Sequence, residues 1–531
     1  MDHGPAAPPV APRATHRSAR SAAGFRAPAS WPLILVLVLQ AVLSARLIGA
    51  DTAFQDEALY LWAGHLEWAG LLHGAPVPPF PSFFSGAPVI YPPLAALADS
   101  VGGLTGARVL SLLFMLGATA LGYFTARRLA GPWAAFFAAA LFAVAGPTLH
   151  LGSFATYDAM ALFLVALAAW LVVRAGDRAD ATLWMAGAGV VLALANLTLY
   201  PSALFDPVVV LLALLVALPT PGGRTAAGRA LTLLAIVAVL VTGALLLGGS
   251  RYLHGVEITT VARVADQDSP TSVLGSAWAW TAVIVVVAAC GAVAAWVSRP
   301  GSVRAWLMTL LVAAALLVPA EQTLLHSTDS LNKHVDLGVW FAAIAAGYAG
   351  ERFITAAPAG RLRLITGAAC AVALCFPAAV GATQSRGFAT AWPNAKAFVG
   401  ILRPLADGTS GRLLVEDPSI AEYYLPSGTQ WERWSSTRNI VLPGGNPTGG
   451  PSDRAGIVGP GNAGTYAVYV KGHYWALIAL NFNDTSGLDK AIAADVKQNK
   501  GYKVVDVVPY GVGPEGTTPG TYIIWRYEPR K

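Results

Sequence analysis

Long apolar segments recur through the first three quarters of the chain, separated by short polar turns. A membrane-spanning helix needs about 20 predominantly apolar residues, and about eleven segments approach or reach that length. They are residues 31–50, 107–126, 132–149, 159–173, 181–199, 202–218, 230–249, 276–297, 305–320, 335–350 and 364–383. The pattern predicts a polytopic α-helical membrane protein with about eleven transmembrane helices.

Two flanking regions lack this pattern. Residues 1–30 are rich in Pro, Ala, Ser and Arg without periodicity, which predicts a disordered basic tail. Residues 31–384 form the predicted transmembrane domain, in which residues 51–106 are the first long loop. Residues 385–531 have the composition of a soluble domain.

The soluble region mixes two kinds of local pattern. Strand-like runs are residues 412–415, 465–470, 502–508 and 521–527. Helix-like runs are residues 394–405, 473–480 and 488–498. Strands interleaved with helices predict a small α/β domain.

The composition supports a membrane protein. Hydrophobic residues make up 55% of the chain, charged residues 12%, and the mean hydropathy is +0.56, values that are not typical of soluble proteins. A net charge of +6 would suggest nucleic acid in a soluble protein, but here the basic residues lie mainly in turns between apolar segments. No nucleic-acid partner is predicted. The cysteines lie in apolar segments and indicate neither a disulfide framework nor a metal site.

The distribution of arginines predicts the orientation. If the basic tail is cytoplasmic, so are the alternate turns that carry most arginines, as the positive-inside rule requires. These are Arg127, Arg128, Arg174, Arg178, Arg224, Arg229, Arg299, Arg304, Arg352, Arg361 and Arg363. We therefore expect a multi-pass plasma-membrane protein with a cytoplasmic N-terminus and an extracytoplasmic C-terminal domain.

Acidic residues and histidines gather at the opposite, outer ends of the predicted spans. Asp56 and Glu57 follow the first span, Asp158 begins the fourth, and Lys333 and His334 precede the tenth. Ionisable groups are costly to desolvate at a membrane, so their concentration on one face favours an active site that opens outward.

Each of these residues also has a structural interpretation. Asp51–Tyr60 could be a hydrated loop, and Asp158 could cap a helix N-terminus. Lys333 could pair with Asp329 or Asp336 instead of binding an anion. The sequence leaves these alternatives open.

The first long loop holds three further candidates. A helix is predicted to begin near Phe54, which turns adjacent side chains about 100° apart, so that only one of Asp56 and Glu57 faces a cavity. Tyr60, His65 and Tyr91 are candidates for positioning the substrate, although interfacial aromatic residues also form lipid-headgroup belts.

Several motifs follow one another in an order that resembles a known enzyme family. They are Asp56-Glu57 with Tyr60, Tyr91-Pro92-Pro93-Leu94, Asp158-Ala159, and Asn196-Leu197-Thr198-Leu199-Tyr200-Pro201. They are similar to motifs of the C-type glycosyltransferases of family 39 and relatives, which include protein O-mannosyltransferases and lipid A aminoarabinose transferases. The resemblance covers roughly residues 31–350. It departs at Leu199, where family members often carry Lys.

The resemblance implies an integral-membrane hexosyl- or pentosyltransferase. Such an enzyme takes a sugar from a polyprenyl-phosphate donor and attaches it to an extracytoplasmic acceptor, which is a protein, a lipid or a polysaccharide. Paired prolines in the second motif predict an extended, rigid re-entry into the membrane.

The candidate residues suit this chemistry. A lipid phosphate leaves readily, so a single carboxylate base suffices where glycosidases use two carboxylates. We expect Asp56 to deprotonate the acceptor hydroxyl with inversion at the anomeric carbon, and Glu57 and Asp158 to position the acceptor or tune that base. Lys333 with His334 would bind the donor phosphate. A divalent cation bridging Asp56 and Asp158 stays an alternative, although no ligand spacing indicates one.

Two other functions stay open. A transporter or flippase of envelope precursors would also be polytopic, but such proteins tend to show internal repeats and charges at mid-membrane, which are not evident here. The other alternative is a non-catalytic scaffold for cell-envelope assembly, in which the α/β domain carries the function.

Overall fold

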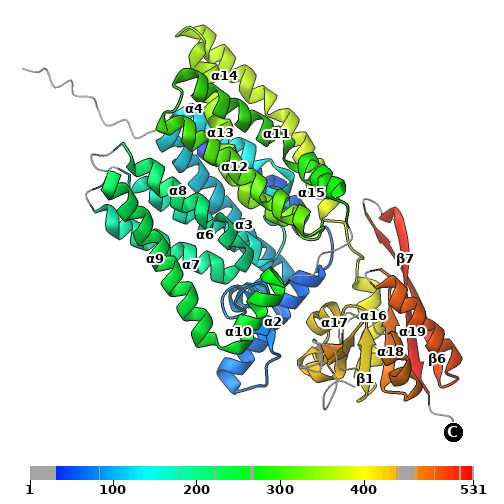
Figure 1. The fold of residues 1–531 in the computed structure, drawn as a ribbon. Helices are drawn as coiled ribbons and strands as arrows, with labels where there is room; N and C mark the ends of the chain where they lie inside the picture. The colour runs from blue at the N-terminus through cyan, green and yellow to red at the C-terminus, as the bar shows by residue number, and fades with distance from the viewer. Residues whose placement is uncertain are drawn as a thin grey trace, which may run out of the picture.

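The chain folds into a helical bundle and a smaller C-terminal part that contains a β-sheet (Figure 1). A computed structural model describes residues 31–528 except 83, 177, 179, 220–222, 263–267, 438–439, 442–456, 459–462, 484 and 514–515. The basic tail predicted for residues 1–30 lies outside the described residues.

Nine helical segments of the described chain are long and apolar enough to cross a membrane. They are Trp31–Ile48 (α1), Tyr91–Ala130 (α3), Tyr157–Arg174 (α6), Ala181–Thr198 (α7), Tyr200–Ala217 (η2, Tyr200–Phe205, and α8, Asp206–Ala217), Thr225–Gly248 (in α9, Gly223–Gly248), Pro270–Ser298 (α11), Val303–Leu324 (α12) and Arg361–Phe388 (α14, Arg361–Ala373, and α15, Cys375–Phe388). Each contains or overlaps one predicted span, so the polytopic helical class is confirmed.

The other two predicted spans are helical but are not among these nine. The first is divided, because the chain is extended at Ala145 and restarts with Pro147 in the first turn, giving Pro132–Ala143 (α4) and Gly146–Leu151 (α5). The second lies in Leu331–Ala356 (α13), which carries charged residues near both ends.

Shorter helices connect the spans or belong to the C-terminal part. They are Gln55–His73 (α2), Phe80–Ser82 (η1), Ser250–Val256 (α10), Glu257–Val261 (η3), Lys396–Asp407 (α16), Pro418–Tyr424 (α17), Pro426–Thr429 (η4), Trp431–Arg433 (η5), Ala463–Lys471 (α18) and Ser486–Gln498 (α19).

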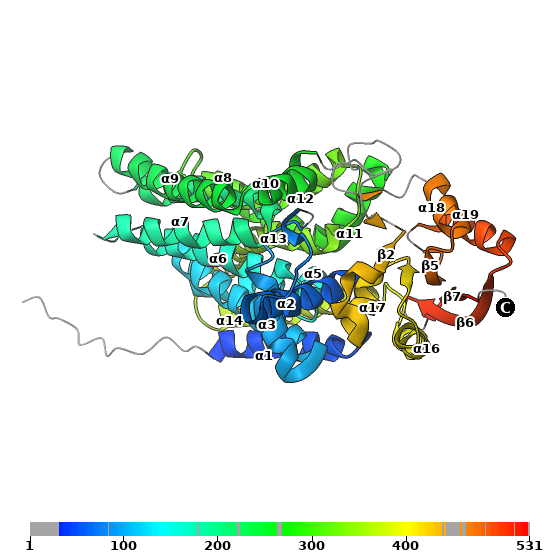
Figure 2. The ribbon, with the colours of Figure 1, turned by 90° about the horizontal axis from the view of Figure 1, so that it is seen from below.

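Helix α13 runs through the middle of the bundle. It packs against α4, α11 and α12 (Figures 1 and 2). Every residue from Lys333 to Tyr348 is buried, so other parts of the protein surround this helix on all sides. At about 1.5 Å per residue, α13 is long enough to carry side chains to both ends of the bundle.

Helix α3 begins at the Tyr-Pro-Pro motif, and the extended backbone predicted there is wrong. Pro92 and Pro93 lie in its first turn, where the missing amide hydrogens are not needed and the fixed φ suits a helix. Gly103 adopts a φ of 61° inside α3 and kinks it. The segment before the kink belongs to the loop region that precedes the second span.

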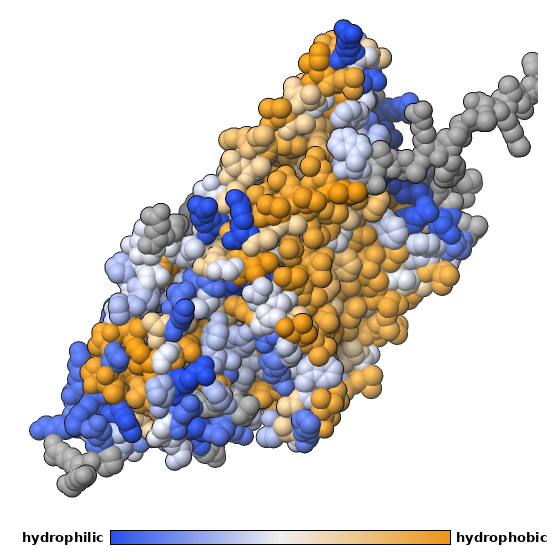
Figure 3. Space-filling view, turned by 180° about the vertical axis from the view of Figure 1, so that it is seen from behind, coloured by the Kyte–Doolittle hydropathy of each residue, from blue (hydrophilic) through white to orange (hydrophobic). Residues whose placement is uncertain are grey.

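The outer surface of the bundle is apolar, as lipid contact requires. Figure 3 shows a broad hydrophobic surface over the helices, with hydrophilic patches toward the two ends. Exposed leucines and valines of α9 and α11 contribute side chains of this kind, among them Leu246, Leu247, Val293 and Val297. Apolar groups that face outward on long helices indicate a lipid-facing surface.

The C-terminal part contains a five-stranded sheet in the order β2-β1-β5-β7-β6. Strand β1 is parallel to β2 and β5, whereas β7 is antiparallel to β5 and β6. The strands are Arg412–Val415 (β1), Trp434–Ser436 (β2), Trp475–Leu480 (β5), Tyr502–Val512 (β6) and Thr518–Tyr527 (β7), and a separate pair joins Ile440–Val441 (β3) to Ile457–Val458 (β4). The predicted small α/β domain is present.

Two local predictions in this domain are wrong. Residues 465–470, expected as a strand, lie in α18, where Tyr466 and Val470 are one helical turn apart and both face the core. Residues 473–480, expected as a helix, contain the central strand β5, which is buried on nearly every residue. A strand buried on both faces lacks the alternation that would identify it.

The sheet domain docks on the start of the bundle. Helix α17 packs on α2, and Figure 2 shows the two side by side. The Ala53 amide donates to the Tyr424 hydroxyl (2.8 Å), the Trp62 indole to the Gly428 carbonyl (3.1 Å), and the Trp392 indole to the Thr52 carbonyl (3.0 Å). Residues 51–62 therefore contact both parts of the molecule.

Candidate active site

Three helix N-termini bring four predicted site residues together at one end of the bundle. Asp56 lies in the first turn of α2, Asp158 in the first turn of α6, and Lys333 and His334 in the first turn of α13. The Lys333 ammonium donates to Asp56 Oδ2 over 2.6 Å, and His334 Nε2 lies 3.3 Å from Asp158 Oδ1. The Asp56–Lys333 contact joins residues 277 positions apart, so the fold brings distant parts of the chain into one cluster.

Lys333 does not pair with Asp329 or Asp336. Asp336 instead accepts a hydrogen bond from the Thr148 hydroxyl over 2.7 Å. The Lys333 side chain is 7% exposed, whereas its partner Asp56 is 23% exposed. The ammonium also lies 5.8 Å from the centre of the Phe154 ring, which covers one side of it. Of the pair, Asp56 is therefore the more exposed group.

Glu57 points away from Asp56 and is completely buried. Arg108 donates to both of its carboxylate oxygens, from Nε over 2.8 Å and from Nη2 over 2.6 Å. The amides of Phe54 (3.0 Å) and Ala155 (2.8 Å) donate to the same carboxylate. Glu57 therefore joins the start of α2 to α3 and to the turn before α6, and it holds Asp56 in place.

Arg108 extends this network to the preceding loop. Its Nη1 donates to the carbonyls of Ile48 and Asp51, and its Nη2 to that of Thr52. The sequence pattern does not predict this role of Arg108. A buried arginine at the start of an apolar span is costly unless paired, and that cost is the signal that could have identified it.

Asp158 does not cap its helix. Thr156 is the N-cap residue of α6, and no side-chain cap hydrogen bond is made there. The Asp158 carboxylate is 3% exposed, and its Oδ1 lies 3.3 Å from His334 Nε2. This contact with His334 and the electrostatic interaction with Lys333 offset part of the desolvation cost. Asp158 therefore belongs to the cluster through His334 and Lys333.

The predicted substrate-positioning residues divide into two groups. Tyr60 and Tyr91 are buried beside Tyr157, with the Tyr60 and Tyr157 rings 4.4 Å apart, so they do not form a lipid belt. Burial raises the pKa of Tyr60 well above its ordinary value, so its hydroxyl stays protonated. His65 lies further along α2, where it pairs with Asp99 over 2.7 Å, and Asp99 also accepts from the Tyr423 hydroxyl. No contact among the described residues joins His65 to the four-residue cluster.

The Asn196–Pro201 motif supports the neighbouring loop. The Ala87 amide donates to the Leu197 carbonyl, and the Tyr200 amide donates to the Ser85 carbonyl, both over 2.7 Å. Leu199, the departure from the family pattern, is fully buried. An apolar side chain suits that position, and it offers no contact to a phosphate.

A cleft of about 220 Å³ lies between the start of α2 and the sheet domain, next to the cluster in sequence but not lined by its four residues. Phe54, Gln55 and Trp392 line it from one side. Asp417 and Asn481, which follow the parallel strands β1 and β5, line it from the other. In open α/β sheets, ligands bind outside the carboxyl ends of the strands, which is where this cleft lies.

The side chains of the cluster do not suit a bound divalent metal ion. Asp56 and Asp158 both interact with the Lys333 ammonium, which already supplies positive charge to them. No group of three or more His, Cys, Asp and Glu side chains in the described ranges is arranged to hold a metal ion. We therefore derive no reaction step through a metal.

A family model and solved structures match the chain. The family described as dolichyl-phosphate-mannose-protein mannosyltransferase matches residues 88–247. ArnT of Cupriavidus metallidurans bound to undecaprenyl phosphate has a similar structure, with a TM-score of 0.59 at 13% identity, covering 93% of this chain and 98% of ArnT. The chain has the C-type glycosyltransferase fold. No curated protein matches the sequence.

An archaeal enzyme with the same fold is also similar. The oligosaccharyltransferase of Archaeoglobus fulgidus has a TM-score of 0.56 at 14% identity, with 92% of this chain and 74% of that one covered. The same protein in complex with an inhibitory peptide and a dolichol-phosphate gives 0.54 at 14% identity, covering 94% and 74%. At these identities the likeness establishes the fold, and the recognised resemblance to C-type glycosyltransferases is confirmed at that level.

Proposed function

We propose that this chain is a membrane glycosyltransferase that moves a sugar from a polyprenyl-phosphate donor to a hydroxyl of an extracytoplasmic acceptor. The observation that carries the proposal is the 2.6 Å pair of Asp56 and Lys333, with Asp158 and His334 beside it, at one end of a C-type glycosyltransferase fold. The family description and the lipid phosphates bound by relatives support the class of donor.

The pair supplies the two charges that the transfer needs. A donor phosphate that enters the cluster would take over the Lys333 ammonium, because phosphate is a strong acceptor of charge-assisted hydrogen bonds. Asp56 is then free to accept the proton of the acceptor hydroxyl. As the acceptor oxygen bonds to the anomeric carbon, the bond from that carbon to the phosphate oxygen breaks, and the anomeric centre inverts. Lys333, with His334, stabilises the negative charge that develops on the leaving phosphate.

The remaining residues orient these groups. Glu57 fixes the start of α2 through Arg108, and Asp158 holds His334 close to the phosphate position. Tyr60 and Tyr91 pack around Tyr157, the residue that precedes Asp158, and so form an aromatic group next to the cluster. We place His65 at the edge of the site through its contact with Asp99 and, through Asp99, with Tyr423 of the sheet domain.

We propose that the acceptor approaches through the 220 Å³ cleft between the bundle and the sheet domain. The arginine distribution supports an orientation in which this end of the bundle and the sheet domain face the extracytoplasmic side. The donor lipid would then reach the cluster from the outer leaflet.

Release of polyprenyl phosphate from defined polyprenyl-phosphate sugars by the purified protein tests the proposal. We expect the wild type to release the carrier and Asp56→Asn to lose at least about 100-fold in rate, as for loss of a general base. Asp51→Asn is the matched control, because it removes a carboxylate from the same loop. A flippase or a scaffold would leave the sugar–phosphate bond intact, and full activity of Asp56→Asn would refute the assigned base.

A further inference from the structure

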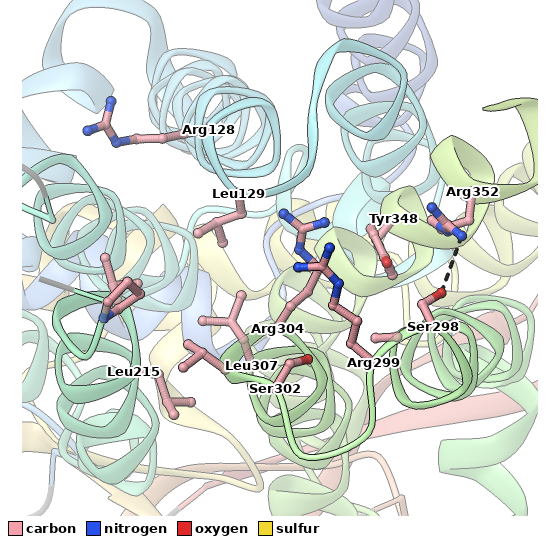
Figure 4. A pocket seen from close by; sticks show the side chains of 14 residues that line it. Arg128, Leu129, Leu215, Ser298, Arg299, Ser302, Arg304, Leu307, Tyr348 and Arg352 are labelled. Atoms are coloured by element: carbon pink, nitrogen blue, oxygen red, sulfur yellow. Dashed lines mark hydrogen bonds between the residues drawn. The ribbon is translucent and has the colours of Figure 1, made fainter.

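A second group of charges lies at the opposite end of α13. A cavity of about 750 Å³ opens there among the ends of α3, α8, α11, α12 and α13. Four arginines are among the 14 residues drawn around it, and Figure 4 shows Arg299 and Arg304 reaching toward each other. In the same view, Arg352 lies on one side of them and Arg128 further away on the other.

Three of the four arginines carry charge that no carboxylate of the described residues pairs with. Arg299, Arg304 and Arg352 pair with no carboxylate in the part of the chain that the structure describes. Arg352 Nη2 donates only to the Ser298 hydroxyl over 3.2 Å, and the Arg304 guanidinium lies 5.9 Å from the centre of the Tyr348 ring. None of the lining residues drawn in Figure 4 is acidic. Guanidinium groups held together in this way favour an anion, and phosphate suits their planar geometry.

Neighbouring aromatic residues place the cavity at the level of lipid headgroups. Trp296 lies one turn before Arg299, and Trp306 lies two residues after Arg304, with the two rings 5.2 Å apart. Trp306 is 52% exposed on the outside of the bundle. Tryptophan is enriched where the hydrocarbon meets the headgroups. The arginines beside these rings are therefore at the depth of lipid phosphates.

The walls of the cavity combine this charge with apolar surface. Leu129, Leu215 and Leu307 line it together with the arginines. A free inorganic anion would gain nothing from leucine side chains, whereas a lipid presents a phosphate with attached hydrocarbon. The mixed lining therefore favours a lipid.

We propose that the cavity lined by Arg299, Arg304 and Arg352 is a binding site for the phosphate headgroup of an anionic membrane lipid. It is separate from the proposed transfer site, because Lys333 and Arg352 are 19 residues apart on α13, about 28 Å along the helix axis. That length is close to the thickness of the hydrocarbon core, so the two sites belong to opposite membrane faces. By the arginine distribution, this face is the cytoplasmic one.

Lipid binding to the purified full-length protein in neutral detergent tests the proposal without any assay of sugar transfer. The affinities for phosphatidylglycerol and phosphatidylcholine are measured by native mass spectrometry for the wild type and for Arg299→Gln/Arg304→Gln. The control Arg178→Gln/Arg361→Gln removes two arginines that do not line the cavity. We expect a preference of the wild type for phosphatidylglycerol, a loss of about tenfold or more in the cavity variant, and less than twofold in the control.

Three results would overturn the proposal. The first is equal loss in the cavity variant and the control, which would mean general attraction to positive charge. The second is an equal affinity of the wild type for the two lipids, a measurement that needs no variant to fold. The third is binding of inorganic pyrophosphate with the same arginine dependence while phosphatidylglycerol binds without it, which would make the ligand a free phosphate.

Discussion

The two ends of α13 carry cations in opposite circumstances. At its start, the buried Lys333 and His334 each contact a carboxylate, Asp56 and Asp158 respectively. Near its other end, Arg352 shares an open cavity with Arg299 and Arg304, and no described carboxylate pairs with any of these three. One end of α13 thus adjoins cations that contact carboxylates, and the other end adjoins arginines that do not.

This difference indicates what each end is suited to do. A buried cation with its own carboxylate can exchange that partner for a substrate phosphate, which leaves the carboxylate free to act as a base. Cations without a partner favour an anion that stays bound. Burial and pairing, more than the number of charges, therefore separate the proposed reaction site from the proposed lipid site.

The largest expected effect comes from breaking the Arg108–Glu57 ion pair, which holds the start of α2 next to the proposed transfer site. Arg108→Met should lower the free energy of unfolding by about 3–5 kcal/mol, because Glu57 is left buried without its partner. Unfolding by denaturant in detergent micelles measures the change, and the exposed Arg361→Met should stay within about 0.5 kcal/mol of the wild type. Arg108→Met/Glu57→Leu should recover most of the loss. An equal loss in the double variant would mean that Arg108 acts through its packing instead of its charge.

Replacing Lys333 at the proposed transfer site should lower the rate of sugar transfer. Lys333→Met should lower the rate of carrier release by about 100-fold, the usual cost of losing one donor to a developing negative charge. Lys396→Met, an exposed lysine of α16, should change the rate by less than about twofold. Lys333→Arg should recover part of the activity if positive charge is the requirement. Retention of full activity by Lys333→Met would remove Lys333 from the phosphate site.

The buried Glu422 carboxyl of the sheet domain should give a smaller effect on stability, and that effect should depend on pH. Burial, and then repulsion from Asp417, raise the pKa of Glu422 in α17 well above its ordinary value. A raised pKa in the folded state stabilises the protein at pH values below the unfolded pKa, near 4.5, and that contribution is lost as the pH rises through the folded pKa. Glu422→Gln should therefore raise the thermal midpoint at pH 8.5 and leave it nearly unchanged at pH 4. An equal shift at both pH values would mean that Glu422 does not titrate between them.

Much of the fold follows from the sequence because lipid demands long apolar helices. Every predicted span coincides with helical structure, and the predicted helix start at Phe54 is its N-cap residue. The sheet domain was harder to predict, because short apolar runs such as residues 473–480 suit a helix as well as a buried strand. The Tyr-Pro-Pro motif was misread because prolines favour the first helical turn as well as extended chain.

The site was predicted as a set of residues but not as a set of pairs. Counting charges located Asp56, Asp158, Lys333 and His334 at the same predicted face. Lys333 pairs with Asp56, and not with the nearby Asp329 or Asp336, because the tertiary fold brings the start of α2 to the start of α13. Local sequence does not encode that arrangement. The Arg108–Glu57 pair was missed for the same reason.

The central claim is that Asp56 and Lys333 act as one unit in sugar transfer, and a double-mutant cycle tests it most directly. Carrier release is measured for the wild type, Asp56→Asn, Lys333→Met and the variant with both changes. If the two residues form one unit, each single change costs about 100-fold and the double variant is no slower than the worse single variant. Losses that multiply to about 10⁴-fold would show two independent contributions and would contradict the account.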